Sequence, residues 1–71
     1  MKKYLVIFEP TATGYSAHVP DLPGCVSAGA TREQAESNIY AAIKLHIEGM
    51  IADGATVPEG KSESKYLVLA E

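Results

Sequence analysis

The stretch Thr31–Asp53 most constrains the fold, because only this part of the chain is long and periodic enough for a substantial helix. Thr31 is a favourable N-cap, and the amide of Gln34 can reach back to it in a capping box. Gly54 can take the left-handed conformation that ends a helix. The mostly apolar residues of one face recur at steps of three and four: Ala35, Ile39, Ala42, Ile43, His46, Ile47 and Met50. A helix with one such face needs a sheet to pack against.

Four other stretches have the composition of β-strands. Residues 3–8 and 65–70 are rich in aromatic and β-branched residues and are apolar on both faces. Residues 15–19 alternate between apolar and polar side chains, and a short connection pairs them with the first strand as a hairpin. Residues 25–30 follow a Pro-Gly pair typical of a type II turn and form a short third strand.

These elements predict one α+β domain over residues 1–71, with two layers and the element order β-β-β-α-β. The first three strands form a meander, and the helix then returns the chain in a right-handed crossover. The first and last strands share the two-sided apolar pattern and are therefore placed side by side. The prediction is a four-stranded sheet of order 3-2-1-4 with one helix packed on one face.

The small size of the chain predicts self-association. A single core of this size gains only ~3–5 kcal/mol, and small domains commonly add disulfides, metals or oligomerisation. Cys25 has no partner for a disulfide, and no Cys/His cluster suggests a metal. We therefore expect a homo-oligomer, a dimer or higher, because the uncovered apolar sheet face needs a partner. The expected interface residues are Leu5, Ile7, Tyr66 and Val68.

The charge of the chain narrows the classes of partner. Nine acidic and six basic residues give a formal net charge of −3, whereas nucleic-acid binding relies on clustered Lys and Arg. We expect no direct nucleic-acid binding and a partner that is itself basic. The apolar run after Lys2-Lys3 is too short for a signal peptide, and no stretch approaches the ~20 apolar residues of a membrane span. These features predict a cytoplasmic protein, away from membranes, with a reduced thiol.

Two histidines are candidates for a chemical role. His18 and Cys25 suggest a Cys–His nucleophile, which requires contact between the ring and the sulfur. Their spacing does not require that contact, so a half-buried thiol beside a turn is the preferred interpretation. His46, on the drier helix face, is a candidate ligand or pH switch, but a core histidine with a hydrogen-bonded ring nitrogen is favoured.

No catalytic constellation emerges from the remaining residues. A two-metal nuclease needs several carboxylates that converge on ions ~4 Å apart. Asp21 lies between two prolines and Asp53 closes the helix, so each has a structural explanation, and a nuclease is disfavoured. No glycine pattern that cradles phosphate is present. The prediction is a protein that is not an enzyme, without a cofactor or a metal site.

Several motifs together resemble the HicB antitoxin family. They are Gly14–Cys25 with its P-D-L-P-G-C turn, Ser27–Thr31, Glu33–Asn38, Ala41–Ile43 with His46, and the helix exit Asp53–Pro58. The resemblance covers nearly the whole chain. It implies a degraded RNase H-like fold without the nuclease carboxylates. It also implies binding to a HicA toxin, a small basic ribonuclease whose catalytic histidine and RNA-binding surface the antitoxin would cover. Many family members add a C-terminal DNA-binding segment, which this sequence, ending at Glu71, does not show; operator binding is therefore not expected of it.

Two functional hypotheses follow. The first is a HicB-like antitoxin module that binds and occludes a HicA-type mRNA-cleaving toxin in a type II toxin–antitoxin system. The alternative is an orphan self-assembling binding or structural module without a toxin partner. For the first, we expect the contact surface on the strand and turn between residues 15 and 25, which combine rigidity with polar and apolar groups. The expected partner-binding residues are Tyr15, His18, Asp21, Leu22, Pro23 and Cys25.

Overall fold

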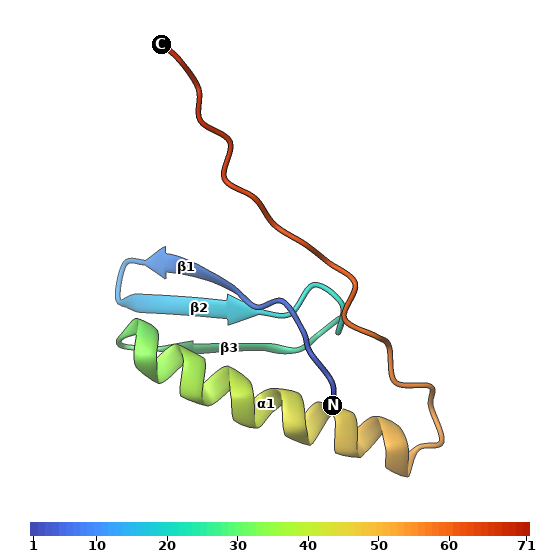
Figure 1. Cartoon of the computed structure of the whole chain (residues 1–71). Coiled ribbons are helices and arrows are strands. Elements are labelled where there is room, and N and C mark those ends of the chain that lie inside the picture. The colour runs from blue at the N-terminus through green and yellow to red at the C-terminus, as the bar shows by residue number, and fades with distance from the viewer.

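The computed structural model describes all residues, 1–71, and contains three strands and one helix. The elements are β1 (Ile7–Thr11), β2 (Gly14–His18), β3 (Val26–Gly29) and α1 (Arg32–Ala52). The strands form one antiparallel sheet of order β1-β2-β3, and α1 packs along β3 and β2 on one face (Figure 1). The predicted α+β class and the single helix are confirmed.

The strand register separates the two faces of the sheet. Phe8 lies opposite Ala17 in β2, and Ala17 lies opposite Ser27 in β3; these residues share the face that α1 covers. Ile7 lies opposite His18, and both belong to the other face, which we call the outer face. The first strand begins at Ile7, later than predicted, because β2 ends at its partner His18 and the chain then turns away.

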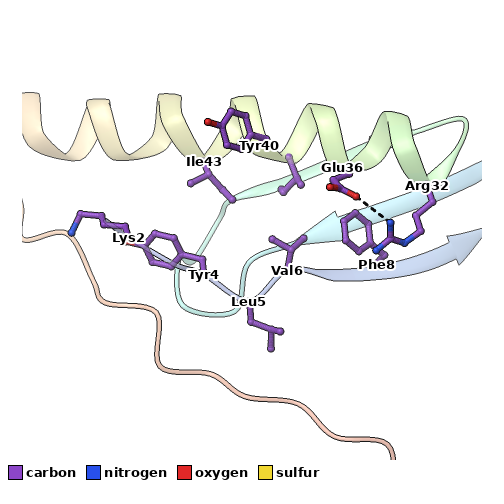
Figure 2. Close-up of a pocket in the computed structure, with 10 residues that line it drawn as sticks. Lys2, Tyr4, Leu5, Val6, Phe8, Arg32, Glu36, Tyr40 and Ile43 are labelled. Carbon is purple, nitrogen blue, oxygen red and sulfur yellow. Dashed lines mark hydrogen bonds and ion pairs between the residues drawn. The ribbon is translucent and has the colours of Figure 1, made fainter.

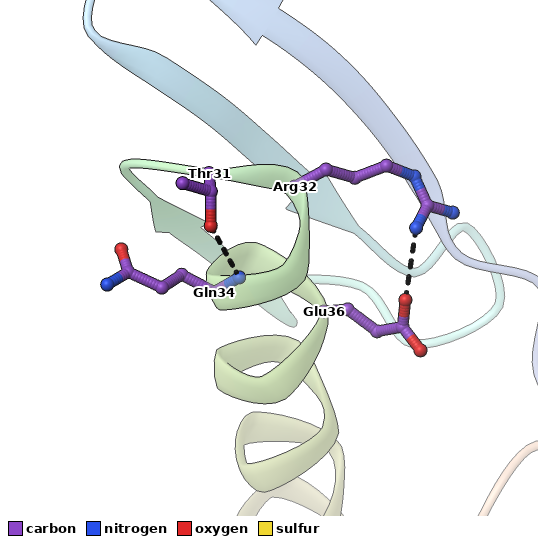
Figure 3. A network of polar contacts seen from close by, with 4 residues as sticks. All are labelled: Thr31, Arg32, Gln34 and Glu36. Atoms are coloured by element: carbon purple, nitrogen blue, oxygen red, sulfur yellow. Dashed lines mark hydrogen bonds and ion pairs between the residues drawn. The ribbon is translucent and has the colours of Figure 1, made fainter.

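The ends of α1 follow their sequence signals closely. Thr31 Oγ1 accepts a hydrogen bond of 3.1 Å from the backbone N–H of Gln34 (Figure 3). The Gln34 side chain accepts in turn from the backbone N–H of Ala30, one residue before the expected capping-box partner. At the C-terminus of α1, Gly54 has φ of +73°. The N–H of Gly54 donates to the carbonyl oxygen of Ile51, and the N–H of Ala55 donates to the carbonyl oxygen of Met50. These two bonds form a Schellman motif.

The core is small and centred between β2, the turn after it, and α1. All seven residues expected on the drier face of α1 are buried or half-buried. Six residues are fully buried: Ala17, Val19, Leu22, Cys25, Ala35 and Ile39. Phe8, Tyr15 and Ile43 are among the half-buried side chains that pack around this cluster. The N-terminal part of the chain therefore covers one side of a core that the helix covers on the other.

The predicted fourth strand is not found, and neither the four-stranded sheet nor its order 3-2-1-4 is supported. Residues 55–71 contain no regular secondary structure, and the last part of the chain runs away from the sheet (Figure 1). In the segment 65–70, Tyr66 is 98% exposed and Val68 is 96% exposed. The apolar pattern of this segment is typical of a strand that is buried on both faces. The pattern does not specify which strand edge this segment pairs with. We call residues 63–71 the tail.

Two glycines test the close packing of α1 on β3. A Cβ atom at Gly29 would lie 2.5 Å from the backbone N of Ala35, whereas a Cβ atom at Gly49 would meet nothing within 4 Å. We expect Gly29→Ala to lower the free energy of unfolding by about 1–3 kcal/mol, because backbone atoms must move apart. Gly49→Ala should raise it by roughly 0.5–1 kcal/mol, since alanine favours a helix interior. Urea unfolding measures both variants, and equal effects would contradict the observed packing.

Candidate partner-binding site

The turn that follows β2 is rigid and well defined. The backbone N–H of Cys25 bonds Leu22 O at 3.0 Å, and the N–H of Leu22 bonds Val19 O at 3.1 Å. Gly24 has φ of +83°, which a type II turn requires at its third position, so the predicted turn type is confirmed. The side chains of Leu22 and Cys25 anchor the turn in the core, with 0% and 3% of their surface exposed.

The structure does not bring the expected partner-binding residues together in one patch. Tyr15 is half-buried and lies on the face toward α1, whereas His18 is half-exposed on the outer face. Pro23 is exposed at the tip of the turn. Because Leu22 and Cys25 are core residues, a partner can reach this part of the turn only through its backbone and through the side chains between them.

A nucleophilic dyad of His18 and Cys25 finds no geometric support. The Nδ1 atom of His18 lies 3.9 Å from a carboxylate oxygen of Glu9, and no hydrogen bond joins the ring to the sulfur. Burial raises the pKa of the Cys25 thiol, which disfavours the thiolate that a nucleophile needs. His46 is half-buried on α1, as expected, but the hydrogen bond expected for its ring is absent.

Asp21 has a structural role that the sequence did not reveal. One carboxylate oxygen accepts from the backbone N–H groups of Lys61 at 2.9 Å and Ser62 at 2.8 Å, and the other accepts from the Ser62 hydroxyl at 2.9 Å. These bonds, chiefly those from Ser62, together with the Lys61 charge, lower the pKa of Asp21. The side chain therefore fixes the base of the tail to the turn after β2.

Two further contacts hold the same segment against the start of the chain. The hydroxyl of Tyr4 donates to the carbonyl oxygen of Pro58. Gly60 lies so close to the Lys3 carbonyl that a Cβ atom at this position would collide with it. The chain after the helix is thus held as far as Ser62, and no hydrogen bond holds the residues that follow.

A shallow groove lies between the N-terminal residues and α1 (Figure 2). Its volume is about 410 Å³, and we call it the β1–α1 groove. Its walls are Tyr4, Leu5, Val6, Phe8, Ile39, Tyr40 and Ile43, with charged side chains at the rim. The Arg32 guanidinium lies 4.3 Å from the centre of the Phe8 ring and bonds Glu36 at 3.1 Å, which fixes one end of the groove (Figures 2 and 3).

The groove is a feature that sequence reasoning missed. Tyr40 is 66% exposed and lies outside the drier face of α1, so its periodicity gave no reason to group it with β1. No three His, Cys, Asp or Glu side chains gather where they could hold a metal ion. None of the helical segments has both the length and the apolar character of a membrane span. The surface features are therefore an apolar groove, a rigid turn and an exposed tail.

Comparison with known proteins assigns the family. The family described as HicB-like antitoxin of bacterial toxin–antitoxin systems matches residues 4–69, which is nearly the whole chain. The chain belongs to the HicB-like antitoxin family. Membership places it among regulatory proteins and not among enzymes, and the resemblance seen in the sequence motifs is confirmed.

The HicB-like chain is also similar to individual proteins of bacteria, archaea and phage. It is 41% identical over 64 residues to an uncharacterised 14.9 kDa protein of Haemophilus phage HP1, covering 90% of this chain and 48% of that protein. A UPF0150 protein of Synechocystis is 46% identical over 57 residues, and the match covers 79% of this chain and 72% of the Synechocystis protein. A UPF0150 protein of Thermoplasma acidophilum is 37% identical over 62 residues, and the match covers 86% of this chain and 90% of the Thermoplasma protein. The chain thus spans about half the length of the phage relative.

A solved structure supports the same assignment at the level of the fold. The HicB-like chain matches a chain of a structure titled HicA3 and HicB3 toxin–antitoxin complex, with a TM-score of 0.73 and 30% sequence identity. The match covers 83% of this chain and 70% of the other. Family and fold therefore agree that this is an antitoxin-type domain.

The Asp21 contacts predict how pH acts on the base of the tail. Because the folded-state pKa is lowered from 3.8, these bonds are fully present above that value and are lost as the pH falls through the lowered pKa. We expect the Ser62 amide resonance to titrate with a midpoint below 3.8. Asp21→Asn should abolish the titration and speed hydrogen exchange at the Lys61 and Ser62 amides above pH ~5, where a free carboxyl is ionised.

Ser62→Ala provides the matched control for this titration. It removes only the hydroxyl bond and leaves both backbone bonds to Asp21, so the midpoint should move part of the way toward the ordinary value. A wild-type midpoint at or above 3.8 would contradict the observed contacts.

Proposed function

We propose that this HicB-like chain is an antitoxin that binds a HicA-type, mRNA-cleaving toxin and occludes it, as part of a type II toxin–antitoxin system. The observation that carries the proposal is the family match over residues 4–69. The match to a chain of a HicA3–HicB3 complex supports it, because the fold similarity extends over 83% of this chain. Inhibition by occlusion needs a stable binding surface and no catalytic group.

The rigid turn and the neighbouring end of β2 form the proposed toxin-contact surface. His18 and Pro23 present exposed or half-exposed side chains there, while Leu22 and Cys25 hold the backbone in place from inside. A surface of this kind loses little conformational entropy on binding, which favours affinity. Tyr15 belongs to the other face of the sheet, so it contributes only if the toxin extends around the β1 edge.

The charge of the chain supports a basic partner. The net charge is −3, and exposed carboxylates lie along the first turns of α1 at Glu33 and Glu36. An acidic surface speeds the encounter with a basic protein and discourages binding to the RNA that such a toxin would hold. We propose accordingly that this chain acts through protein contacts, in the cytoplasm, without binding nucleic acid itself.

Self-association is the second part of the proposal. Leu5 and Ile7 are half-buried next to the uncovered β1 edge, and Tyr66 and Val68 are almost fully exposed on the tail. Apolar side chains in these positions are typical of surfaces that bind another protein. We propose a homo-oligomer, a dimer or higher, that uses these residues, and a degraded RNase H-like domain as its unit.

The toxin proposal is tested with the product of a short basic reading frame adjacent to the gene. Co-expression and isothermal titration calorimetry should show a stable complex, and His18→Ala should weaken it by about tenfold, the effect of losing a contact worth ~1.4 kcal/mol. Ser37→Ala, on the exposed side of α1, is the matched control and should leave the affinity unchanged.

Two negative outcomes have different meanings. Unchanged affinity in His18→Ala removes the turn from the contact surface but keeps the antitoxin function. Absence of any complex with the neighbouring product, and no inhibition of RNA cleavage, rejects the antitoxin proposal and favours the orphan self-assembling module.

A further inference from the structure

The tail is the most unusual feature of the isolated subunit. Its apolar side chains are almost wholly exposed, with fractions of 98%, 77%, 96% and 81% for Tyr66, Leu67, Val68 and Leu69. The radius of gyration is 13.9 Å, whereas a compact chain of this length has about 11 Å. Four consecutive apolar residues in an extended, solvated segment are costly unless another surface covers them.

The β1 edge is a suitable acceptor for a strand. β1 pairs only with β2, so the backbone groups of its other edge have no neighbour in the sheet. An open edge of this kind is a template for an additional strand. Pro10 lacks an N–H and limits pairing at the far end, so the usable edge is residues 7–9 of β1 together with residues 4–6, which precede the strand and pair with no other strand.

The tail passes the β1 edge at residues 64–66 without joining it and then runs away from the sheet (Figure 1). Ser64, Lys65 and Tyr66 line a hollow of about 750 Å³ together with Leu5 and Ile7. No hydrogen bond connects the tail with β1. There is thus open space beside β1, and the segment with strand composition lies outside the sheet (Figure 1).

We propose that residues 65–70 of one copy add to the β1 edge of a second copy as its fourth strand, and that the two copies exchange tails reciprocally. The inference deepens the self-association part of the proposed function and is independent of toxin binding. Each copy then donates one strand and accepts one, which closes the assembly as a two-fold dimer without further growth. Each sheet would then have four strands, the number that the sequence pattern predicts.

The two faces of the tail match the two faces of the acceptor site. Alternation places Tyr66 and Val68 on one side of the added strand and Leu67 and Leu69 on the other, and both sets are apolar. A strand beside β1 has one face toward the β1–α1 groove and the other toward Leu5 and Ile7, both of which are apolar too. A donated strand that is apolar on both faces would therefore contact apolar residues on both faces.

The base of the tail favours a second copy over the same chain as acceptor. Asp21 holds Lys61 and Ser62, and Gly60 rests against the Lys3 carbonyl, so the residues directly before the tail are tied to the start of the chain and to the turn after β2. The chain's own tail has to swing across the hollow to reach the edge. The tail of a second copy enters the same space while these contacts remain in place.

The test uses the full chain without a toxin. Val68→Pro removes a backbone donor from the proposed strand, and Val68→Thr keeps both the donor and the β-branched shape. Because Val68 is 96% exposed in the subunit, neither change disturbs the sheet or α1, and circular dichroism verifies this. Light scattering at micromolar concentration should give a dimer for the wild type and Val68→Thr, and a monomer for Val68→Pro.

Hydrogen exchange and isotope-mixed NMR decide where the tail binds. In the dimer, amides 65–70 should be protected, and intermolecular NOEs should join the tail of a labelled copy to Leu5 and Ile7 of an unlabelled copy. The inference is overturned if the wild type is monomeric, or if Val68→Pro remains a dimer. It is likewise overturned if the tail is protected in a monomer, where it pairs with its own sheet, or only after toxin is added.

Discussion

The packing of α1 against β2 and the following turn is the interaction on which the rest of the structure depends. Ala35 and Ile39 on the helix meet Ala17, Val19 and Leu22 below, and all five are essentially excluded from water. Burying such side chains contributes roughly 1.5–3 kcal/mol for each of the larger ones. Because so few side chains are buried, this core fixes the helix, β2 and the turn, but it contributes little free energy to hold segments farther away.

Local signals in the sequence predicted local structure well, because the physical cause lies within a few residues. The Thr31 cap, the left-handed Gly54 and the Pro-Gly turn each depend on backbone conformation and nearby hydrogen bonds. The site was less predictable. Asp21 was expected to face a partner, yet its bonds go to Lys61 and Ser62, some forty residues away, and no sequence spacing encodes such a contact.

Burial within the turn could not be read from its composition either. Leu22 and Cys25 stand among prolines and glycine, which indicate an exposed loop, but the type II turn points both side chains into the core. Rigidity and exposure therefore come from different residues: the buried pair fixes the backbone, and Pro23 and His18 present the surface. A turn built in this way does not have to reorganise on binding, which suits the toxin-contact surface proposed above for this member of an antitoxin family.

The tail shows why strand composition and strand position are separate properties. The two apolar faces of residues 65–70 predict a strand inside a sheet, but the subunit leaves these residues outside its sheet with their apolar side chains exposed. The sequence could not say whose sheet they complete, since hydrogen bonds and apolar contacts are the same whether the edge belongs to one chain or to another. A 71-residue chain with a six-residue core has a physical reason to leave this strand free. In the exchange proposed above, this segment adds its apolar area to an interface between two copies, and association would then supply the stability that so small a core lacks.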